Sequence, residues 1–417
     1  MGKTLSGKIF ITKASNPTLE SKLLEDNPTI GIRNDFNAPF TTNTANTLYK
    51  ATENGTDVYY FAGQDTTSTP INNWVKFGKT NKVSCIYNGN QVKVGNYDHG
   101  FEKIISASFV ENQSQCEVTG ICVTTDFGPV VGVTSSECSD HGGTWVSETA
   151  TYNGLIDFDT YWRIIRTNAD GSVRMLYSGT SPDTTESFIG TSEFNTYETE
   201  SPKYVGYMYG DSDTTLEEAR TNTNDSTIKI YIDNWYENNL TAYTNYLSND
   251  AIFCNDRELA SGSAYSTSSS NYFYFKPYER LKTNKTPTYD CTNNKDAFSV
   301  NNAEAKLKYP IALMTADEIA YAGGVYKQSA PMWYYTNSTY NSIIGLTSWW
   351  LLSPSSWNVG TWVEIVNSSN PSGAIGAFGV YQSYAVRPVV SLKTCIKYST
   401  GNGSSSSPYE IVENGGC

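Results

Sequence analysis

The sequence predicts an α+β fold with few strands, two helices and long ordered loops, joined to a small disulfide-rich β insert. The part after residue 158 has two helical patterns and one clear hairpin, while residues 79–157 hold four of the eight cysteines and both histidines. We therefore divide the chain into an N-terminal helix and polar lead-in (1–56), strands that join the main domain (57–78), the insert (79–157) and the main domain (158–417). Two disulfides would compensate for the small core of the insert.

The helices are predicted from spacing and capping residues. Residues 17–26, PTLESKLLED, have helical spacing and acidic character. Residues 226–247 have an apolar face and an N-cap at Asp225 or Ser226. The run TADE at 315–318 is a capping box that begins a short helix, and the Gly-Gly pair after it ends that helix.

The strands are predicted from short aromatic and β-branched runs. Residues 57–63 and 72–78 are two such runs joined by a polar loop. Residues 161–177, YWRIIRTNADGSVRMLY, form a hairpin because Asp-Gly supplies the positive φ of a tight turn. A buried strand is expected at 309–314, and a final strand, YEIV, follows the turn-forming segment at 401–408.

Charge excludes two classes of partner. The chain has 42 acidic against 29 basic residues, a formal net charge of −13, and no Lys/Arg cluster. Nucleic acid and anionic membranes attract positive charge, so neither is expected as a partner. Polarity comes instead from Asn, Ser and Thr beside 31 Tyr and 32 Gly, a profile typical of secreted bacterial surface proteins.

The cysteines are even in number and contain no CxxC motif, which favours disulfides over a metal site or a redox motif. A bridge between Cys254 and Cys291 would close the loop-rich region between them, and Cys395 and Cys417 straddle a terminal turn. The pairing among the other four stays open. The predicted disulfide-forming residues are Cys85, Cys116, Cys122, Cys138, Cys254, Cys291, Cys395 and Cys417.

Two metal sites are weighed and set aside, so we expect no metal and no cofactor. A Cys3His zinc site has unsuitable spacing and would leave Cys85 unpaired; its residues would be Cys116, Cys122, Cys138 and His141. A calcium site at Asp211, Asp213 and Glu217 departs from the EF-hand spacing, and a solvated acidic loop is the simpler interpretation.

Four segments carry a resemblance to a known fold: YWRIIRTNADGSVRMLY, TADEIAYAGG, WWLLSPSSW and YAVRPVVSLK. They resemble the C-type-lectin-like fold over roughly residues 158–417. The pairing of WWLLSP with VRPVVSL is similar to surface proteins of gut bacteria and to the variable proteins of diversity-generating retroelements. Those variable proteins present a hypervariable ligand-binding face, so the resemblance implies a face of that kind here.

Some motifs of the fold class are missing. Calcium-dependent lectins of this class carry Glu-Pro-Asn or Gln-Pro-Asp followed by Trp-Asn-Asp, and none of these tripeptides occurs in the sequence. The formylglycine-generating enzymes share the fold but need a thiol pair, whereas Cys395 and Cys417 are interpreted as a disulfide. The resemblance therefore implies neither calcium-dependent sugar binding nor the activity of the formylglycine-generating enzymes.

The tryptophan-rich stretch at 349–362 predicts both core and surface. At least one of Trp349 and Trp350 should pack inward beside two leucines, and at least one of Trp357 and Trp362 should be exposed. Trp, Tyr, Asn and Ser over 355–384 have the chemistry of antibody paratopes. The predicted ligand-binding residues are Ser356, Trp357, Asn358, Thr361, Trp362, Asn367, Asn370, Phe378, Tyr381, Gln382 and Tyr384.

An enzyme is not expected. Both histidines, His99 and His141, lie in the insert, so the main domain has no histidine base for a nucleophile. No Gly-rich phosphate loop is present, and no carboxylate pair stands in an apolar setting. Arg387 is expected to pair with a carboxylate, and Pro388 to place its strand at an edge or a bulge.

These observations predict a secreted or cell-surface bacterial protein that binds a ligand through the loops within 355–384. The expected partner is a protein or glycan on another cell or phage surface. Targeting and anchor segments are expected to lie outside this chain, because no apolar run in it could span a bilayer. The alternative is a pilin-like or fibre-tip structural subunit without a specific ligand.

Overall fold

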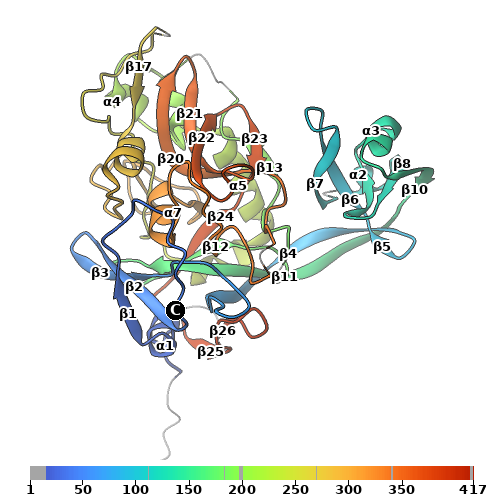
Figure 1. Ribbon diagram of the computed structural model, residues 1–417, viewed down its shortest axis with the longest axis horizontal. Coiled ribbons are helices and arrows are strands. Elements are labelled where there is room, and N and C mark those ends of the chain that lie inside the picture. The colour runs from blue at the N-terminus through green and yellow to red at the C-terminus, as the bar shows by residue number, and fades with distance from the viewer. Residues whose placement is uncertain are drawn as a thin grey trace, which may run out of the picture.

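The computed structural model describes residues 16–110, 112–182, 184–196, 201–268, 270–339, 341–413 and 417. Strands dominate these residues, in three large sheets with a few short helices around them (Figure 1). The prediction of a C-type-lectin-like α+β fold is wrong: the chain is a large, mostly β protein with several mixed sheets. Segments that look like polar loops in the sequence pair with distant strands, and their Thr and Tyr residues suit an extended backbone.

The central sheet has eleven strands, ordered β1-β2-β3-β11-β12-β24-β19, with β4 beside β11 and with β5 and β26 beside β4. Most pairs are antiparallel, but β1 with β2 and β26 with β4 are parallel. Its strands are β1 Thr29–Ile32, β2 Thr47–Glu53, β3 Thr56–Tyr60, β4 Trp74–Tyr87, β5 Asn90–Gln91, β11 Thr151–Thr167, β12 Val173–Tyr177, β19 Ala312–Leu313, β24 Pro388–Leu392, β25 Tyr398–Thr400 and β26 Tyr409–Ile411.

A second sheet, here the tip sheet, is built mainly from the last quarter of the chain. Its order is β13-β23-β20-β21-β22, and β17 adds to the other side of β20 near its end. Its strands are β13 Thr191–Glu193, β17 Tyr272–Tyr274, β20 Trp349–Asn358, β21 Thr361–Val366, β22 Ile375–Gly379 and β23 Ser383–Ala385.

The third sheet belongs to residues 79–157. Its order is β10-β8-β9-β6-β7. The short helix at 135–140 packs against it, and the one at 113–116 packs against the long strands β4 and β11. Its strands are β6 Lys93–Asp98, β7 Lys103–Phe109, β8 Thr119–Thr124, β9 Gly128–Val131 and β10 Thr144–Thr149. Two further two-stranded sheets pair β14 Met208–Tyr209 with β15 Asn224–Asp225, and β16 Phe253–Cys254 with β18 Ala297–Phe298.

The helices are short and lie between or beside the sheets. The α-helices are α1 Leu19–Asp26, α2 Gln113–Cys116, α3 Ser135–Asp140, α4 Leu216–Ala219, α5 Thr227–Asn239, α6 Lys276–Tyr278 and α7 Ala316–Ala322. Tighter or wider turns form η1 Pro202–Val205, η2 Thr241–Tyr246 and η3 Glu279–Asn284. One large apolar core joins the central sheet, the tip sheet, α5 and α7.

Local signals in the sequence predict their elements correctly. α1 and α7 form as expected, and α7 has the reciprocal capping box of Thr315 and Glu318. Gly323 ends α7 with a φ of 118°, a conformation that favours glycine. β11 and β12 form the predicted hairpin. α5 begins after Ser226, whose side chain caps it, and ends at Asn239, earlier than predicted.

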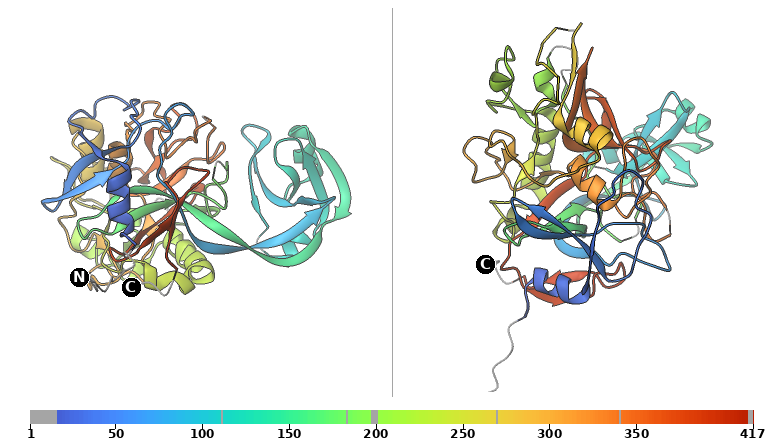
Figure 2. Two further views of the ribbon diagram at one scale, coloured as in Figure 1. Left: turned by 90° about the horizontal axis from the view of Figure 1, so that it is seen from below. Right: turned by 60° about the vertical axis from the view of Figure 1, so that its left-hand side comes forward.

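The insert is carried on two long strands. β4 and β11 leave the central sheet side by side and continue into residues 79–157, so the boundary at 78/79 falls inside a strand. Figure 2 (left) shows the third sheet held beside the body on this two-stranded arm. Bridges Cys85–Cys116 and Cys122–Cys138 cross-link the insert, which has small apolar clusters of its own.

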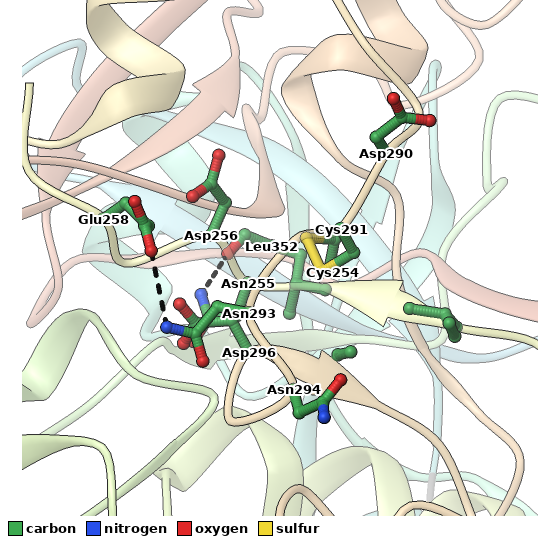
Figure 3. Close-up of a disulfide and its surroundings, with 12 residues drawn as sticks. Cys254, Asn255, Asp256, Glu258, Asp290, Cys291, Asn293, Asn294, Asp296 and Leu352 are labelled. Carbon is green, nitrogen blue, oxygen red and sulfur yellow. Dashed lines mark hydrogen bonds between the residues drawn. A yellow bond between two sulfur atoms is a disulfide. The ribbon is translucent and has the colours of Figure 1, made fainter. Parts of the chain in front are cut away.

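Two further disulfides lie in the body, Cys254–Cys291 and Cys395–Cys417. In Figure 3 the first of them lies beside Asn255, whose amide donates to the Leu352 carbonyl at 2.7 Å and so links this loop region to β20. Four disulfides suit an oxidising, extracellular compartment. Within the described residues no helix is long and apolar enough to cross a bilayer.

Both expectations for Arg387 and Pro388 are wrong. The Arg387 guanidinium is buried and donates to the carbonyls of Tyr177 and Tyr334, with its plane over Trp349 at 4.9 Å. Backbone carbonyls take the place of a carboxylate, and burial holds the pKa of Arg387 well below its usual range. Pro388 begins β24, which lies between β12 and β19, and a first strand position needs no N–H donor.

Candidate ligand-binding surface

The strands β17, β20, β21 and β22 come together at one end of the tip sheet (Figure 1). Apolar side chains near this end are exposed. Tyr272 on β17 pairs with Asn358 at the end of β20. The turn from β20 to β21 carries Val359, and Trp362 follows on β21 opposite Gly379. We call this surface the aromatic tip; its residues are Tyr272, Asn358, Val359, Trp362, Phe378 and Tyr381.

The aromatic tip is exposed to an unusual degree for apolar side chains. The exposed fractions are 68% for Tyr272, 67% for Val359, 42% for Tyr381 and 41% for Phe378. Trp362 is half-buried. Large apolar side chains that cluster on a surface mark binding sites, whereas scattered ones need no explanation.

A chain of aromatic rings connects this surface to the core. Trp362 lies 6.1 Å from Phe378, Phe378 lies 5.6 Å from Tyr384, and Tyr384 lies 5.2 Å from the fully buried Trp350. Burial, with a smaller effect from Tyr381, raises the pKa of Tyr384 to about 12, so its phenol is neutral at physiological pH. Packing against neighbouring rings therefore holds Trp362 and Phe378 in place.

The turn at the aromatic tip contains a strained residue. Val359 has a φ of 61°, in the left-handed region that β-branched residues avoid. Its neighbours close the turn, because the Asn358 N–H donates to the Gly360 carbonyl at 3.0 Å. Strain of this kind is often found at functional positions, where an apolar side chain is presented despite its backbone cost.

Three of the predicted ligand-binding residues are buried, and their prediction is corrected. Trp357 is 1% exposed because β17 pairs along this part of β20, and its indole N–H donates to the Ser268 carbonyl at 3.2 Å. Ser356 is buried between β17 and β21. Thr361 is buried, and its hydroxyl donates to the Ser201 carbonyl at 2.9 Å.

The other predicted residues fall into two places. Near the aromatic tip lie Asn358, Trp362, Phe378, Tyr381, Gln382 and Tyr384. Asn367 and Asn370 lie in the loop between β21 and β22, at the opposite end of that strand pair, so the structure does not bring them to the tip. Tyr272 and Val359 belong to the surface and were missed, because the strand-favouring run YFYF at 272–275 lies in a region that was interpreted as loops, and an exposed turn valine gives no signal.

Trp349 and Trp350 are both fully buried, which confirms the prediction that at least one of them packs inward. Trp357 is buried and Trp362 is half-buried, so neither has the full exposure that was predicted for at least one of this pair. Three of the four indoles in the stretch at 349–362 therefore fill the core beside the tip sheet, and the fourth, Trp362, is only partly exposed.

A buried charge network lies elsewhere in the body, and the sequence did not reveal it. It surrounds a cavity of about 20 Å³, where Glu318 contacts Arg166 and Arg174 and Asp317 pairs with Arg280. A cavity of this volume can hold about one water molecule. Because the charges pair with one another, we assign this network to structure.

The sites weighed for metal and catalysis have other partners. All four cysteines of the insert are in disulfides, which leaves no thiolate for zinc. Glu217 pairs with Lys295 at 2.8 Å, and Asp211 accepts from Asn224. The His141 ring accepts from the Ile104 N–H and contacts Asp126 at 3.1 Å. Within the described ranges, no group of three or more metal-ligating side chains is found.

No family model, curated protein or solved structure matches this chain. The resemblance to surface proteins of gut bacteria and to retroelement variable proteins therefore stays a prediction. The C-type-lectin-like fold that it implied is wrong for this chain.

Proposed function

We propose that this chain is a secreted or cell-surface binding protein whose contact surface is the aromatic tip. The observation that carries the proposal is the clustering of Tyr272, Val359, Phe378 and Tyr381, all at least 41% exposed, at one end of one sheet. Exposing them to water is unfavourable, and a partner that covers them recovers that free energy.

The surface is also pre-organised. Phe378 is tied to the buried Trp350 through Tyr384, and the strand pairs fix the backbones of β17, β20, β21 and β22. Tyr and Trp add contact area at low entropic cost because their side chains have two rotatable bonds. Little conformational freedom is left to lose on binding.

The chemistry of the surface favours a protein partner on another cell or on a phage. No tip residue is charged, and the apolar side chains outnumber the one amide, Asn358. Interface centres between proteins are enriched in aromatic residues and depleted in charge in the same way. A glycan partner would need more convergent hydrogen-bonding groups than the tip offers.

The test replaces the exposed rings and leaves the strands intact. The double variant Tyr272→Ser/Tyr381→Ser should weaken binding to intact cells or phage particles at least about tenfold, because aromatic anchors often contribute 2 kcal/mol or more. Phe101→Ser is the matched control, since Phe101 is 69% exposed but lies in the insert. If the tip variant and the control bind equally well, the aromatic tip is not the contact surface. If instead binding on a glycan array depends on the tip residues, the partner is a sugar and not a protein.

The structural-subunit alternative has one observation in its favour. β1 is an end strand of the central sheet and exposes Ile30 at 41% and Ile32 at 66%. An exposed apolar edge can pair with another chain. Concentration-dependent polymers that vanish in Ile32→Lys would support assembly through this edge, and a monomer at all concentrations would reject it.

A further inference from the structure

A large hollow lies between the body and the insert, remote in the fold from the aromatic tip. It has a volume of about 540 Å³ and is lined by α5, by the segment 186–189, by the β4–β11 arm and by the end of β7. Small-molecule sites commonly have volumes of 300 to 1,000 Å³. The insert is also fixed on this side, because Lys93 pairs with Glu186 and the Ile105 backbone passes close to Gly345.

One wall is a stripe along α5. Tyr231, Asn234, Trp235 and Asn238 follow helical spacing and all line the hollow. Trp235 packs edge-on against Tyr177 at 5.4 Å, which fixes its ring. Asn234 and Asn238 are exposed, and their side-chain amides form no hydrogen bond to any other described residue. Each amide offers a donor and an acceptor toward the hollow.

The opposite wall carries a cation without a carboxylate partner. The Lys82 ammonium lies over the Phe109 ring at 3.7 Å. Across the described part of the chain it forms no salt bridge, since the nearby Glu186 is engaged by Lys93. Burial is the largest influence on Lys82 and lowers its pKa to about 8; Glu186 opposes that shift and Lys93 adds to it.

We propose that this hollow binds a small carboxylated sugar, with its ring against Trp235, its hydroxyls on Asn234 and Asn238, and its carboxylate on Lys82. The aromatic faces suit the C–H face of a sugar ring, and paired donors and acceptors suit neighbouring hydroxyls. A carboxylate would supply the counter-charge that Lys82 lacks. A polyanion is disfavoured by the net charge of −13, so the ligand has one or two acidic groups.

The ligand class is tested by removing only its charge. Isothermal titration would compare a sialylated trisaccharide and a glucuronic-acid disaccharide with their carboxyl-reduced forms. The proposal requires that at least one acid binds, and at least tenfold more tightly than its neutral form. The two acids together show which sugar carries the carboxylate. Equal binding of acid and neutral forms, or no binding of either acid, overturns the proposal.

Variants then locate the site. Lys82→Gln should weaken binding of the preferred acid at least tenfold, whereas Lys306→Gln, an exposed lysine in the body, should leave it unchanged. Asn234→Ala/Asn238→Ala should weaken both acid and neutral forms, and alanine favours the helix, so folding is kept. Tyr272→Ser/Tyr381→Ser at the aromatic tip should have no effect. Wild-type affinity in Lys82→Gln overturns the site.

The pH profile provides a second readout. The charged and titratable groups near Lys82 are Glu186 and the phenols of Tyr177 and Tyr231, which line the hollow, and Lys93, which pairs with Glu186. A bound carboxylate favours the protonated amine, so binding takes up a proton near pH 8. Affinity should fall by up to tenfold per pH unit above pH 8 in the wild type but not in Lys82→Gln. A flat wild-type profile from pH 7 to 9.5 overturns the role of Lys82.

Discussion

The Glu318 carboxylate and the Arg174 guanidinium lie against each other in the interior, with Oε1 2.6 Å from Nε and each side chain 1% exposed. The same oxygen contacts Arg166 at 3.2 Å, and Arg166 pairs with Glu53 at 2.9 Å. The other Glu318 oxygen accepts from the Thr315 N–H at the start of α7. One carboxylate therefore links α7 to two strands of the central sheet.

Glu318→Gln should lower the free energy of unfolding by about 3–5 kcal/mol, because it leaves two buried guanidinium groups with one acid between them. Denaturant unfolding measures the change. Asp57→Asn is the control: Asp57 pairs with Lys50 at the surface, at 3.1 Å, and its loss should cost less than about 1 kcal/mol. Equal effects of the two variants would show that the buried network adds no stability.

The disulfides should differ in what they hold together. Cys254–Cys291 closes 37 residues of the body and Cys122–Cys138 closes 16 residues of the insert. Loop-closure entropy assigns about 4 and about 3 kcal/mol to them, respectively. Replacing the first pair by Ser should lower the stability of the whole body.

Replacing the second pair should instead raise hydrogen exchange mainly within 79–157, since the insert has its own small apolar clusters and is joined to the body mainly by the β4–β11 arm, with the Lys93–Glu186 ion pair beside it. Mass spectrometry of peptides resolves the two outcomes. Exchange that rises throughout the body in Cys122→Ser/Cys138→Ser would show that insert and body unfold as one unit.

Glu364 should make stability depend on pH. It lies on β21, is fully buried, and neither of its oxygens has a well-formed hydrogen bond to a described residue. Burial raises its pKa well above 4.5, only partly opposed by the nearby Ser355 hydroxyl. Above pH 4.5 the folded state therefore holds a proton that the unfolded state releases. The contribution of Glu364 to the free energy of unfolding is full below pH 4.5 and is lost as the pH rises toward the folded pKa.

Glu364→Gln removes that dependence and keeps the shape of the side chain. Relative to the wild type, the free energy of unfolding of the variant should rise by up to about 1.4 kcal/mol per pH unit above 4.5, until the pH reaches the folded pKa of Glu364. Unfolding curves of both proteins at pH 4, 6 and 8 measure the difference. A constant difference across this range would mean that Glu364 has a partner in the folded protein.

The sequence predicts what is decided locally. The α7 capping box lies within four residues, and the β11–β12 hairpin is set by its own turn, so both could be recognised. Trp357 shows the opposite case. Its Ser and Asn neighbours suggest exposure, but β17 pairs with this part of β20 across more than 80 residues of chain and covers the indole.

The fold class was missed for the same reason. The pairing of β1 with β2, or of β26 with β4, depends on which distant strands meet, and short polar strands leave little periodic signal. The candidate site was half predicted: Trp362, Phe378 and Tyr381 are found together at the surface. Tyr272 could be added only once β17 was placed beside Asn358.

Val359→Asn separates stability from binding at the aromatic tip. Asn tolerates the left-handed backbone at a φ of 61°, so the variant should be more stable than the wild type by about 1 kcal/mol. Val118→Asn is the control, because Val118 is 39% exposed without a positive φ and should gain nothing. If the valine is presented to a partner, the stabilised variant should bind cells or phage several-fold more weakly. Thermal unfolding measures the stability of the variant, and the binding assay measures its affinity. A variant that is more stable but binds with unchanged affinity would show that the partner contacts only the aromatic rings.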